Sequence, residues 1–108
     1  MENVDVGGKR NVLDTKAVTL PEEYKLAQNY PNPFNPTTTI AFSLKQPGKT
    51  VLEIYNILGQ KVATLVNEQL TAGAHQYNWN AAGQASGIYF YRLMAGNFVE
   101  TKKMMLLK

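Results

Sequence analysis

The chain has 108 residues, of which 44% are hydrophobic and 18% are charged, and its formal net charge is +3. Because a chain of this length buries about two-thirds of its unfolded surface, it supports one domain with a single core, and its composition is that of a globular protein. The absence of cysteine excludes a disulfide framework and a thiolate metal site, and no apolar run reaches the roughly 18 residues of a membrane span.

Residues 1–23 differ from the remainder in charge and pattern. They carry three Lys or Arg against five Asp or Glu, a net charge of −2, whereas residues 24–108 carry eight against three, a net charge of +5. "NVDV" and "AVTL" alternate as strands do, but Gly7-Gly8 interrupts the pattern. We therefore expect a linker or arm over residues 1–23 and one folded domain over residues 24–108. No signal-peptide core is present, so an export signal would lie in a precursor segment upstream.

Short β-like segments separated by turn signals follow one another along the folded part. In residues 37–44, "TTTIAFSL", the alternation places Ile40, Phe42 and Leu44 on one face of a strand. The same criteria predict further strands at residues 50–56, 60–66, 74–80, 88–94 and 98–108. About seven short strands with a turn roughly every eight to twelve residues predict an all-β fold, an antiparallel β-sandwich.

Side-chain placement within these segments is also predictable. In the turn "NILG", Asn56 is expected to cap the backbone with its side chain, and Gly59 to adopt the left-handed conformation. Alternation further places two sets of residues on single faces of their strands: His75, Tyr77 and Trp79, and then Tyr89, Tyr91 and Leu93.

The segment "NYPNPFNP" before the first of these strands is unusually constrained. Each proline fixes φ near about −65° and lacks an N–H donor, and the residue before each proline is kept out of the helical region. Such a segment does not fit a central strand. We expect a corner at the edge of the sandwich, with Tyr30 and Phe34 held in the core. A PxxP-type ligand, from the spacing of Pro33 and Pro36, is a less favoured alternative.

The folded part offers little for catalysis. Its carboxylates, Glu53, Glu68 and Glu100, lie on or beside different strands, so no pair is predicted within reach of one substrate. The single histidine, His75, shares a strand face with aromatic residues, which favours packing over a role as a base. One histidine without cysteine excludes structural zinc, and no phosphate-binding glycine loop occurs. We therefore predict a protein that is not an enzyme and uses no metal or cofactor.

Nucleic-acid binding is also disfavoured, although the folded part is basic and rich in tyrosine. A stacking platform needs exposed aromatic rings on one sheet face, with Lys or Arg beside them. In "YFYR" the rings alternate between the two faces, so at least half of them are predicted to lie in the core. No nucleic-acid partner is expected.

Five stretches occur in a recognisable order between Leu26 and Lys108: "LAQNYPNPFNPTTTIAFSL", "VLEIYNILGQKVATLV", "AGAHQYNWNAAG", "ASGIYFYRLMAG" and "TKKMMLLK". Together they resemble the C-terminal sorting domain of the type IX secretion system and, in part, the Ig-like module of flagellar hook-capping proteins. The resemblance implies a seven-stranded Ig-like sandwich that follows a passenger protein, which is secreted or displayed at the cell surface. The partners it implies are the outer-membrane translocon and a sortase-like peptidase.

By position, the motifs of the resembled family fall on the proline-rich segment, on "SGIYFYRL" and on the basic closing strand. The residues expected to carry recognition are Pro31, Asn32, Pro33, Asn35, Pro36, Gly87, Tyr89, Lys102 and Lys103. The chain departs from the family after the tryptophan, where "NAAG" replaces a frequent Asp-Gly.

Two further functions stay open at this point. If residues 1–23 form a strand, the arm of one copy would extend a sheet of the next, giving a homo-oligomer or an extracellular filament. A surface-adhesion or glycan-binding module would use Trp79 and several tyrosines, although Trp79 fits a core position better.

Overall fold

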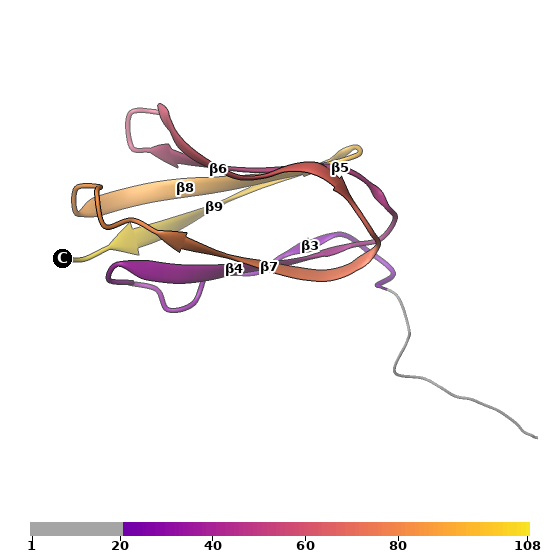
Figure 1. The fold of residues 1–108 in the computed structure, drawn as a ribbon, viewed down its shortest axis with the longest axis horizontal. Coiled ribbons are helices and arrows are strands. Elements are labelled where there is room, and N and C mark those ends of the chain that lie inside the picture. The colour runs from indigo at the N-terminus through magenta and orange to yellow at the C-terminus, as the bar shows by residue number, and fades with distance from the viewer. Residues whose placement is uncertain (1–20) are drawn as a thin grey trace, which may run out of the picture.

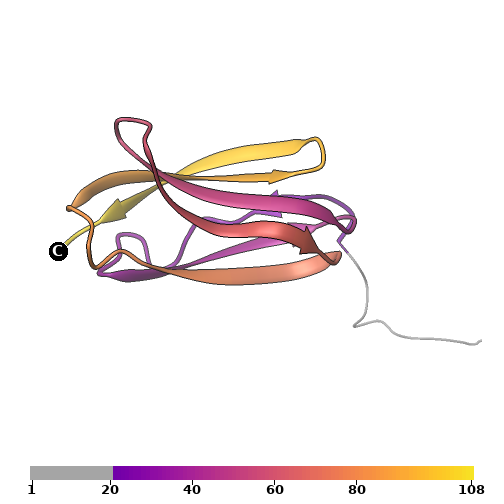
Figure 2. The same ribbon diagram turned by 45° about the horizontal axis from the view of Figure 1, so that its top comes forward.

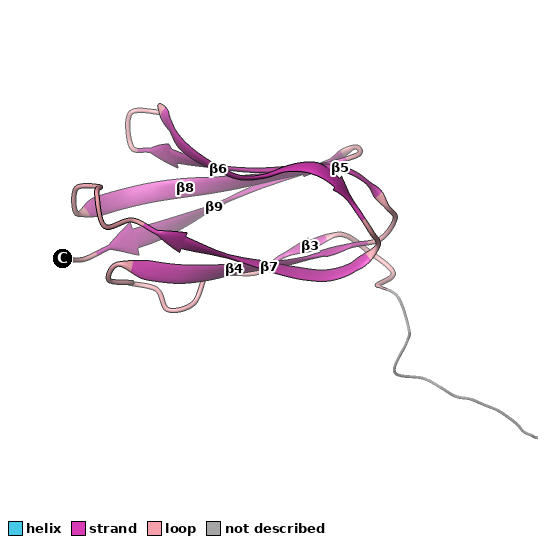
Figure 3. Ribbon diagram, viewed as in Figure 1, coloured by secondary structure: helices cyan, strands magenta, loops and turns pink. Residues whose placement is uncertain are grey.

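Two antiparallel sheets form the protein in a computed structural model, which describes residues 21–108 (Figure 1). The first sheet has the order β3-β4-β7 and contains β3 (Lys25–Leu26), β4 (Thr37–Leu44) and β7 (Gly73–Asn80). The second has the order β6-β5-β8-β9 and contains β5 (Gly48–Asn56), β6 (Lys61–Leu70), β8 (Gly87–Ala95) and β9 (Phe98–Leu106). Figure 3 shows strands and loops without a helix in the described part.

The order in which the chain visits the sheets is consistent with an Ig-like sandwich. β3 and β4 lie in one sheet, β5 and β6 in the other, β7 in the first again, and β8 and β9 in the second (Figure 2). All pairs of named strands are antiparallel. The prediction of an all-β sandwich with about seven strands is confirmed. Residues 1–20 of the predicted arm, which spans residues 1–23, lie outside the described residues.

The core forms where the alternating residues of the two sheets face each other. β4, β5 and β8 bury every second side chain, as their sequences predict. Burying each such side chain contributes roughly 1.5–3 kcal/mol. The buried residues of these three strands include Ile40, Phe42, Leu44, Leu52, Ile54, Tyr89, Tyr91 and Leu93.

Two strands differ from their predicted form. β6 continues to Leu70, beyond its predicted end at Val66. It is an edge strand, and its last four residues, "NEQL", are largely exposed. Exposed strand residues are commonly polar, so these four show no apolar alternation that would predict a strand. β3 precedes the proline-rich segment, so Thr37–Leu44 is not the first strand. Its two residues are too few to show an alternating pattern.

The turn between β5 and β6 has the predicted construction. The N–H groups of Leu58 and Gln60 both donate to Oδ1 of Asn56, at 2.9 and 3.0 Å. Gly59 has φ of 83°, in the left-handed region that glycine adopts without strain. The side chain of Asn56 therefore fixes the conformation of this turn.

The hydroxyl of Tyr91 joins β8 to the chain that leaves β3. The O–H donates to the carbonyl of Ala27 at 2.7 Å, and the hydroxyl oxygen accepts the N–H of Asn29 at 2.8 Å. Burial of the ring raises the pKa of Tyr91 to about 12. One side chain from the second sheet thus satisfies two backbone groups at the edge of the first.

We expect Tyr91→Phe to lower the free energy of unfolding by about 1–3 kcal/mol, because two backbone groups at a buried position lose their partner. Urea unfolding at pH 7 measures this loss. Tyr30→Phe is the matched control, since the Tyr30 side chain is 80% exposed, and it should change stability by less than about 0.5 kcal/mol. Equal stability of the two variants would contradict the role of the Tyr91 hydroxyl.

The raised pKa of Tyr91 predicts a loss of stability at high pH. The folded state holds the phenol proton more tightly than the unfolded state, in which the pKa is near 10. The contribution is therefore complete below pH 10 and is lost as the pH rises through about 12. The difference in unfolding free energy between wild type and Tyr91→Phe should shrink over this range. A constant difference would show that Tyr91 does not titrate with folding.

Candidate recognition site

The proline-rich segment crosses the side of the sandwich and is hydrogen-bonded to both sheets. Tyr30 and Thr39 of β4 exchange two backbone hydrogen bonds, at 3.0 and 2.9 Å. Four residues later, the N–H of Phe34 donates to the carbonyl of Met105, and the N–H of Leu107 donates to the carbonyl of Phe34, each at 3.0 Å. The segment therefore forms the predicted corner and links β4 to the end of β9.

The two aromatic rings of this segment have opposite environments. Phe34 is 2% exposed, and its ring centroid lies 5.8 Å from that of Trp79. Tyr30 is 80% exposed, so the prediction that it lies in the core is wrong. Tyr30 pairs with Thr39, which alternates with the buried side chains of β4, and paired residues in a sheet place their side chains on the same face. The ring of Tyr30 therefore lies on the outer face.

A buried polar cluster holds the chain as it enters the prolines. Nδ2 of Asn29 donates to Oγ1 of Thr38 at 2.9 Å and to the carbonyl of Pro31 at 3.1 Å. Oγ1 of Thr38 donates to the same carbonyl at 2.9 Å. Because prolines donate no backbone hydrogen bonds, these side chains supply the bonds that fix the segment. Sequence reasoning missed both residues, since an Asn and a Thr beside a turn give no sign that they are buried.

The segment also covers part of the exposed edge of β9. Oδ1 of Asn32 accepts the N–H of Met105 at 3.0 Å, and Nε2 of Gln28 donates to the carbonyl of Lys103 at 2.8 Å. With the two bonds of Phe34, these contacts satisfy the outward backbone groups from Lys103 to Leu107. An edge strand with unpaired backbone groups invites pairing with other chains, and this half of the edge is closed.

Gly87 and Tyr89 shape the start of β8. Gly87 has φ of 146°, which L-residues with side chains rarely adopt. Two residues on, the buried Tyr89 donates its O–H to the carbonyl of Ala85 at 2.7 Å. This link from a strand back to the preceding loop is the tyrosine corner of Ig-like sandwiches. The ring also meets Trp79 edge-on, with centroids 5.5 Å apart.

The two lysines of the closing strand lie on opposite faces of β9. Lys102 is partly buried and forms an ion pair with Glu100 at 3.3 Å. Lys103 is exposed and pairs in the sheet with Phe90 of β8. The structure therefore does not bring the two ammonium groups together.

The fold gathers five of the nine predicted recognition residues around two adjoining hollows. The first, of about 280 Å³, lies between the β5–β6 turn and the chain entering β8, and Gly87 and Tyr89 line it. The second, of about 220 Å³, lies between the proline-rich segment and β9, and Asn32, Pro33 and Lys103 line it. Ile88 lines both hollows. The remaining predicted residues, Pro31, Asn35, Pro36 and Lys102, lie outside these linings.

Glu53, on the outer face of the second sheet, is a carboxylate with three partners. Glu53 accepts the hydroxyl hydrogen of Tyr55 and lies 3.3 Å from Nζ of Lys61 and 3.5 Å from Nη2 of Arg92. The Tyr55 hydrogen bond and the two cations keep the pKa of Glu53 below its ordinary value, although partial burial opposes them. Glu53 is therefore ionised and balances the positive charges of Lys61 and Arg92.

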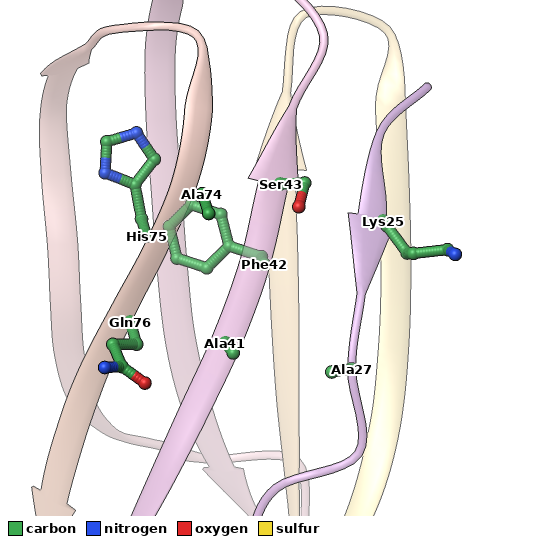
Figure 4. A pocket seen from close by; sticks show the side chains of 8 residues that line it. All are labelled: Lys25, Ala27, Ala41, Phe42, Ser43, Ala74, His75 and Gln76. Atoms are coloured by element: carbon green, nitrogen blue, oxygen red, sulfur yellow. The ribbon is translucent and has the colours of Figure 1, made fainter. Parts of the chain in front are cut away.

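A third hollow, of about 350 Å³, lies on the first sheet and contains no predicted recognition residue (Figure 4). Small side chains form much of its lining, which consists of Lys25, Ala27, Ala41, Phe42, Ser43, Ala74, His75 and Gln76. Nε2 of His75 lies 2.8 Å from the carbonyl oxygen of Thr71, and its ring stacks on Phe42 at 5.6 Å. His75 thus packs as its sequence position suggests, with no carboxylate in the lining to form a catalytic pair.

Residues 21–108 were also searched for metal-binding clusters and membrane-spanning helices. Between residues 21 and 108, no three His, Asp or Glu side chains gather in a way that would hold a metal ion. The same part of the chain contains no helix long and apolar enough to cross a membrane.

The model of the secretion system C-terminal sorting domain family matches residues 28–107. The chain belongs to this family. No curated protein matches the chain. The predicted resemblance to the type IX sorting domain is confirmed, and the chain carries a C-terminal sorting signal of that system. Such a signal implies interaction with the type IX machinery and export to the cell surface or beyond.

The family match begins at Gln28 and so contains the whole proline-rich segment and both adjoining hollows. The matched region starts with the residues that join the two sheets and includes every named strand except β3. Sorting domains of this family are not known as enzymes.

We expect Phe34→Ala to lower the free energy of unfolding by about 3–5 kcal/mol, because a fully buried ring is removed and its contact with Trp79 is lost. Tyr30→Ala should cost less than about 0.5 kcal/mol, since that ring lies in solvent. Chemical denaturation of both variants measures the difference. If Tyr30→Ala were the more damaging, the assignment of the two rings would be reversed.

Proposed function

We propose that this sorting domain directs a passenger protein, joined upstream of it, through the type IX translocon to the cell surface. The observation that supports this most is the convergence of Asn32, Pro33, Gly87, Tyr89 and Lys103 on two adjoining hollows. These residues come from three separate parts of the sequence. The signal would therefore be read from the folded sandwich and would be lost when the domain unfolds.

The described chain begins at the end of the sandwich opposite the hollows, so a passenger joined upstream would lie away from them. The ring of Tyr24 stacks on Phe98, with centroids 5.4 Å apart, and Phe98 begins β9. The hollows lie at the opposite end of β9, where Ile88 pairs with Met105. Figure 1 shows the C-terminus at one end of the sandwich and the start of the described chain at the other. A passenger would leave the hollows open.

Removal of the sorting domain by a sortase-like peptidase is part of the proposal. A peptidase needs an extended, accessible segment, and the chain is hydrogen-bonded into a sheet from Lys25 onward. Cleavage would therefore fall before Lys25.

The alternatives receive less support. The strand-addition model depends on the arm at residues 1–23, of which residues 1–20 lie outside the described part. Only the sequence alternation of the arm and its charge, opposite to that of residues 24–108, favour a filament. An adhesion surface built on Trp79 is opposed by its burial between Phe34 and Tyr89.

A fusion of the full chain to the C-terminus of a periplasmic reporter tests the proposal in a host with a type IX system. We expect the reporter at the cell surface, measured by protease accessibility and antibody labelling of intact cells. Retention of the wild-type fusion in the periplasm would refute the proposed function. Truncation of β9 is not an informative variant, because Met104 and Leu106 are buried and their loss would unfold the domain.

Point substitution of an exposed proline separates recognition from folding. We expect Pro33→Ala to lower the free energy of unfolding by no more than about 1 kcal/mol, because one backbone restriction is removed. It should reduce surface export about tenfold, which corresponds to a loss of about 1.4 kcal/mol in recognition. Pro47→Ala is the matched control, since Pro47 is also exposed but lies in the β4–β5 turn, away from the hollows. Equal export of both variants, or a large destabilisation by Pro33→Ala, would make the proline a structural residue only.

A further inference from the structure

Exposed apolar side chains are concentrated at one end of the sandwich. Among the described residues, the large hydrophobic side chains with high exposure are Tyr30, Ile57, Leu58, Val99, Met105 and Leu107. All except Val99 belong to the β5–β6 turn, the end of β9 or the proline-rich segment. Figures 1 and 2 show the β5–β6 turn and the C-terminus at the same end. We call this end the apolar end.

The β5–β6 turn presents two of these side chains without a structural need for them. Oδ1 of Asn56 and the left-handed Gly59 fix the turn, while Ile57 and Leu58 between them are 67% and 78% exposed. Tight turns usually place polar residues at such positions. Contiguous exposed apolar groups on a soluble domain are typical of interaction sites.

The two adjoining hollows open between these exposed groups. Ile57 and Leu58 line the first hollow, Met105 lines the second, and Ile88 separates them. The first hollow, about 280 Å³, and the second, about 220 Å³, are each of a size for an apolar side chain rather than for a whole ligand. Recognition of extended peptides commonly uses such separate pockets for individual side chains.

The charge around the hollows has one sign. Lys103 is the only charged residue in either lining, and neither lining contains a carboxylate. Elsewhere in the described part, Glu53 and Glu100 are already paired with cations. A partner with an acidic residue beside its apolar groups would complement this surface.

We propose that the apolar end binds an extended segment of a partner protein, which places one apolar side chain in each hollow and a carboxylate beside Lys103. This proposal rests on the proposed function, because the partner is then a component of the type IX machinery. Concave sites on either side of Ile88 favour discrete side chains over a lipid surface, which has none to insert.

The first test uses the full chain fused to the exported reporter. We expect the double substitution Ile57→Ser and Leu58→Ser to reduce surface export about tenfold or more, because two apolar contacts of the partner are lost. Val99→Ser is the matched control, since Val99 is exposed on the same sheet but near the other end of β9. It should export like the wild type. Both variants should keep the melting temperature of the wild type, because the substituted side chains lie in solvent.

The second test identifies the occupant. A photo-crosslinking amino acid at position 58 of the fusion should form an adduct with a translocon component, and the same group at position 99 should not. Lys103→Glu should reduce the adduct several-fold, whereas Lys49→Glu, at an exposed position near the other end, should not. An adduct at position 58 that is insensitive to Lys103→Glu would overturn the predicted carboxylate contact.

Other occupants give distinct results. Purified full chain that sediments with vesicles of phosphatidylethanolamine and phosphatidylglycerol, and loses this binding with Ile57→Ser and Leu58→Ser, would identify a lipid surface and overturn the proposal. A dimer that the same substitutions abolish would identify a second copy and also overturn it. Normal export of the doubly substituted fusion would refute the apolar end as a docking site while leaving the sorting function intact. Failure of the wild-type fusion to reach the surface would instead refute the proposed function itself.

Discussion

The structure depends on the backbone pairing of Phe34 with the end of β9. This pairing places a buried ring against Trp79 and, at the same point, covers part of the β9 edge of the second sheet. Four residues earlier, Tyr30 is paired with the first sheet. A segment of a few residues is therefore hydrogen-bonded to both sheets and fixes their relative position along one side. Because three prolines restrict its backbone, little conformational entropy is lost when it adopts this path.

Several of the proposed recognition residues also have structural roles. Asn32 accepts the N–H of Met105 and also lines a hollow, and its neighbour Pro33 lines the same hollow while remaining exposed. Gly87 and Tyr89 build the tyrosine corner and line the adjoining hollow. The proposed signal would be complete only in the folded sandwich, because its residues share a surface only in the folded state.

Much of the fold could be predicted from the sequence, because alternation of apolar residues locates strands and assigns their faces. β4 shows this clearly, with bounds that match its "TTTIAFSL" pattern. The fate of Tyr30 could not be predicted, since it depends on pairing with Thr39, a long-range contact with no local signature. The buried amide of Asn29 was missed for the same reason. The motif residues were predicted individually, but each hollow is formed by segments that lie far apart in sequence, residues 56–58 with 84–89 in the first and residues 32–33 with 88 and 103–105 in the second.

The exposed apolar side chains of the apolar end favour non-specific association in water, and two features of the structure limit this. Ile57 and Leu58 are exposed on a turn whose conformation is fixed by Asn56, so they cannot collapse onto the core to escape water. At the same end, the edge of β9 is closed by the proline-rich segment, which removes the backbone groups through which exposed strands associate. Lys103 adds charge beside the apolar groups. The proline-rich segment thus blocks strand addition along this part of β9, while the proposed docking side chains stay exposed. Because the turn is rigid, the proposed binding would require little further ordering of the domain.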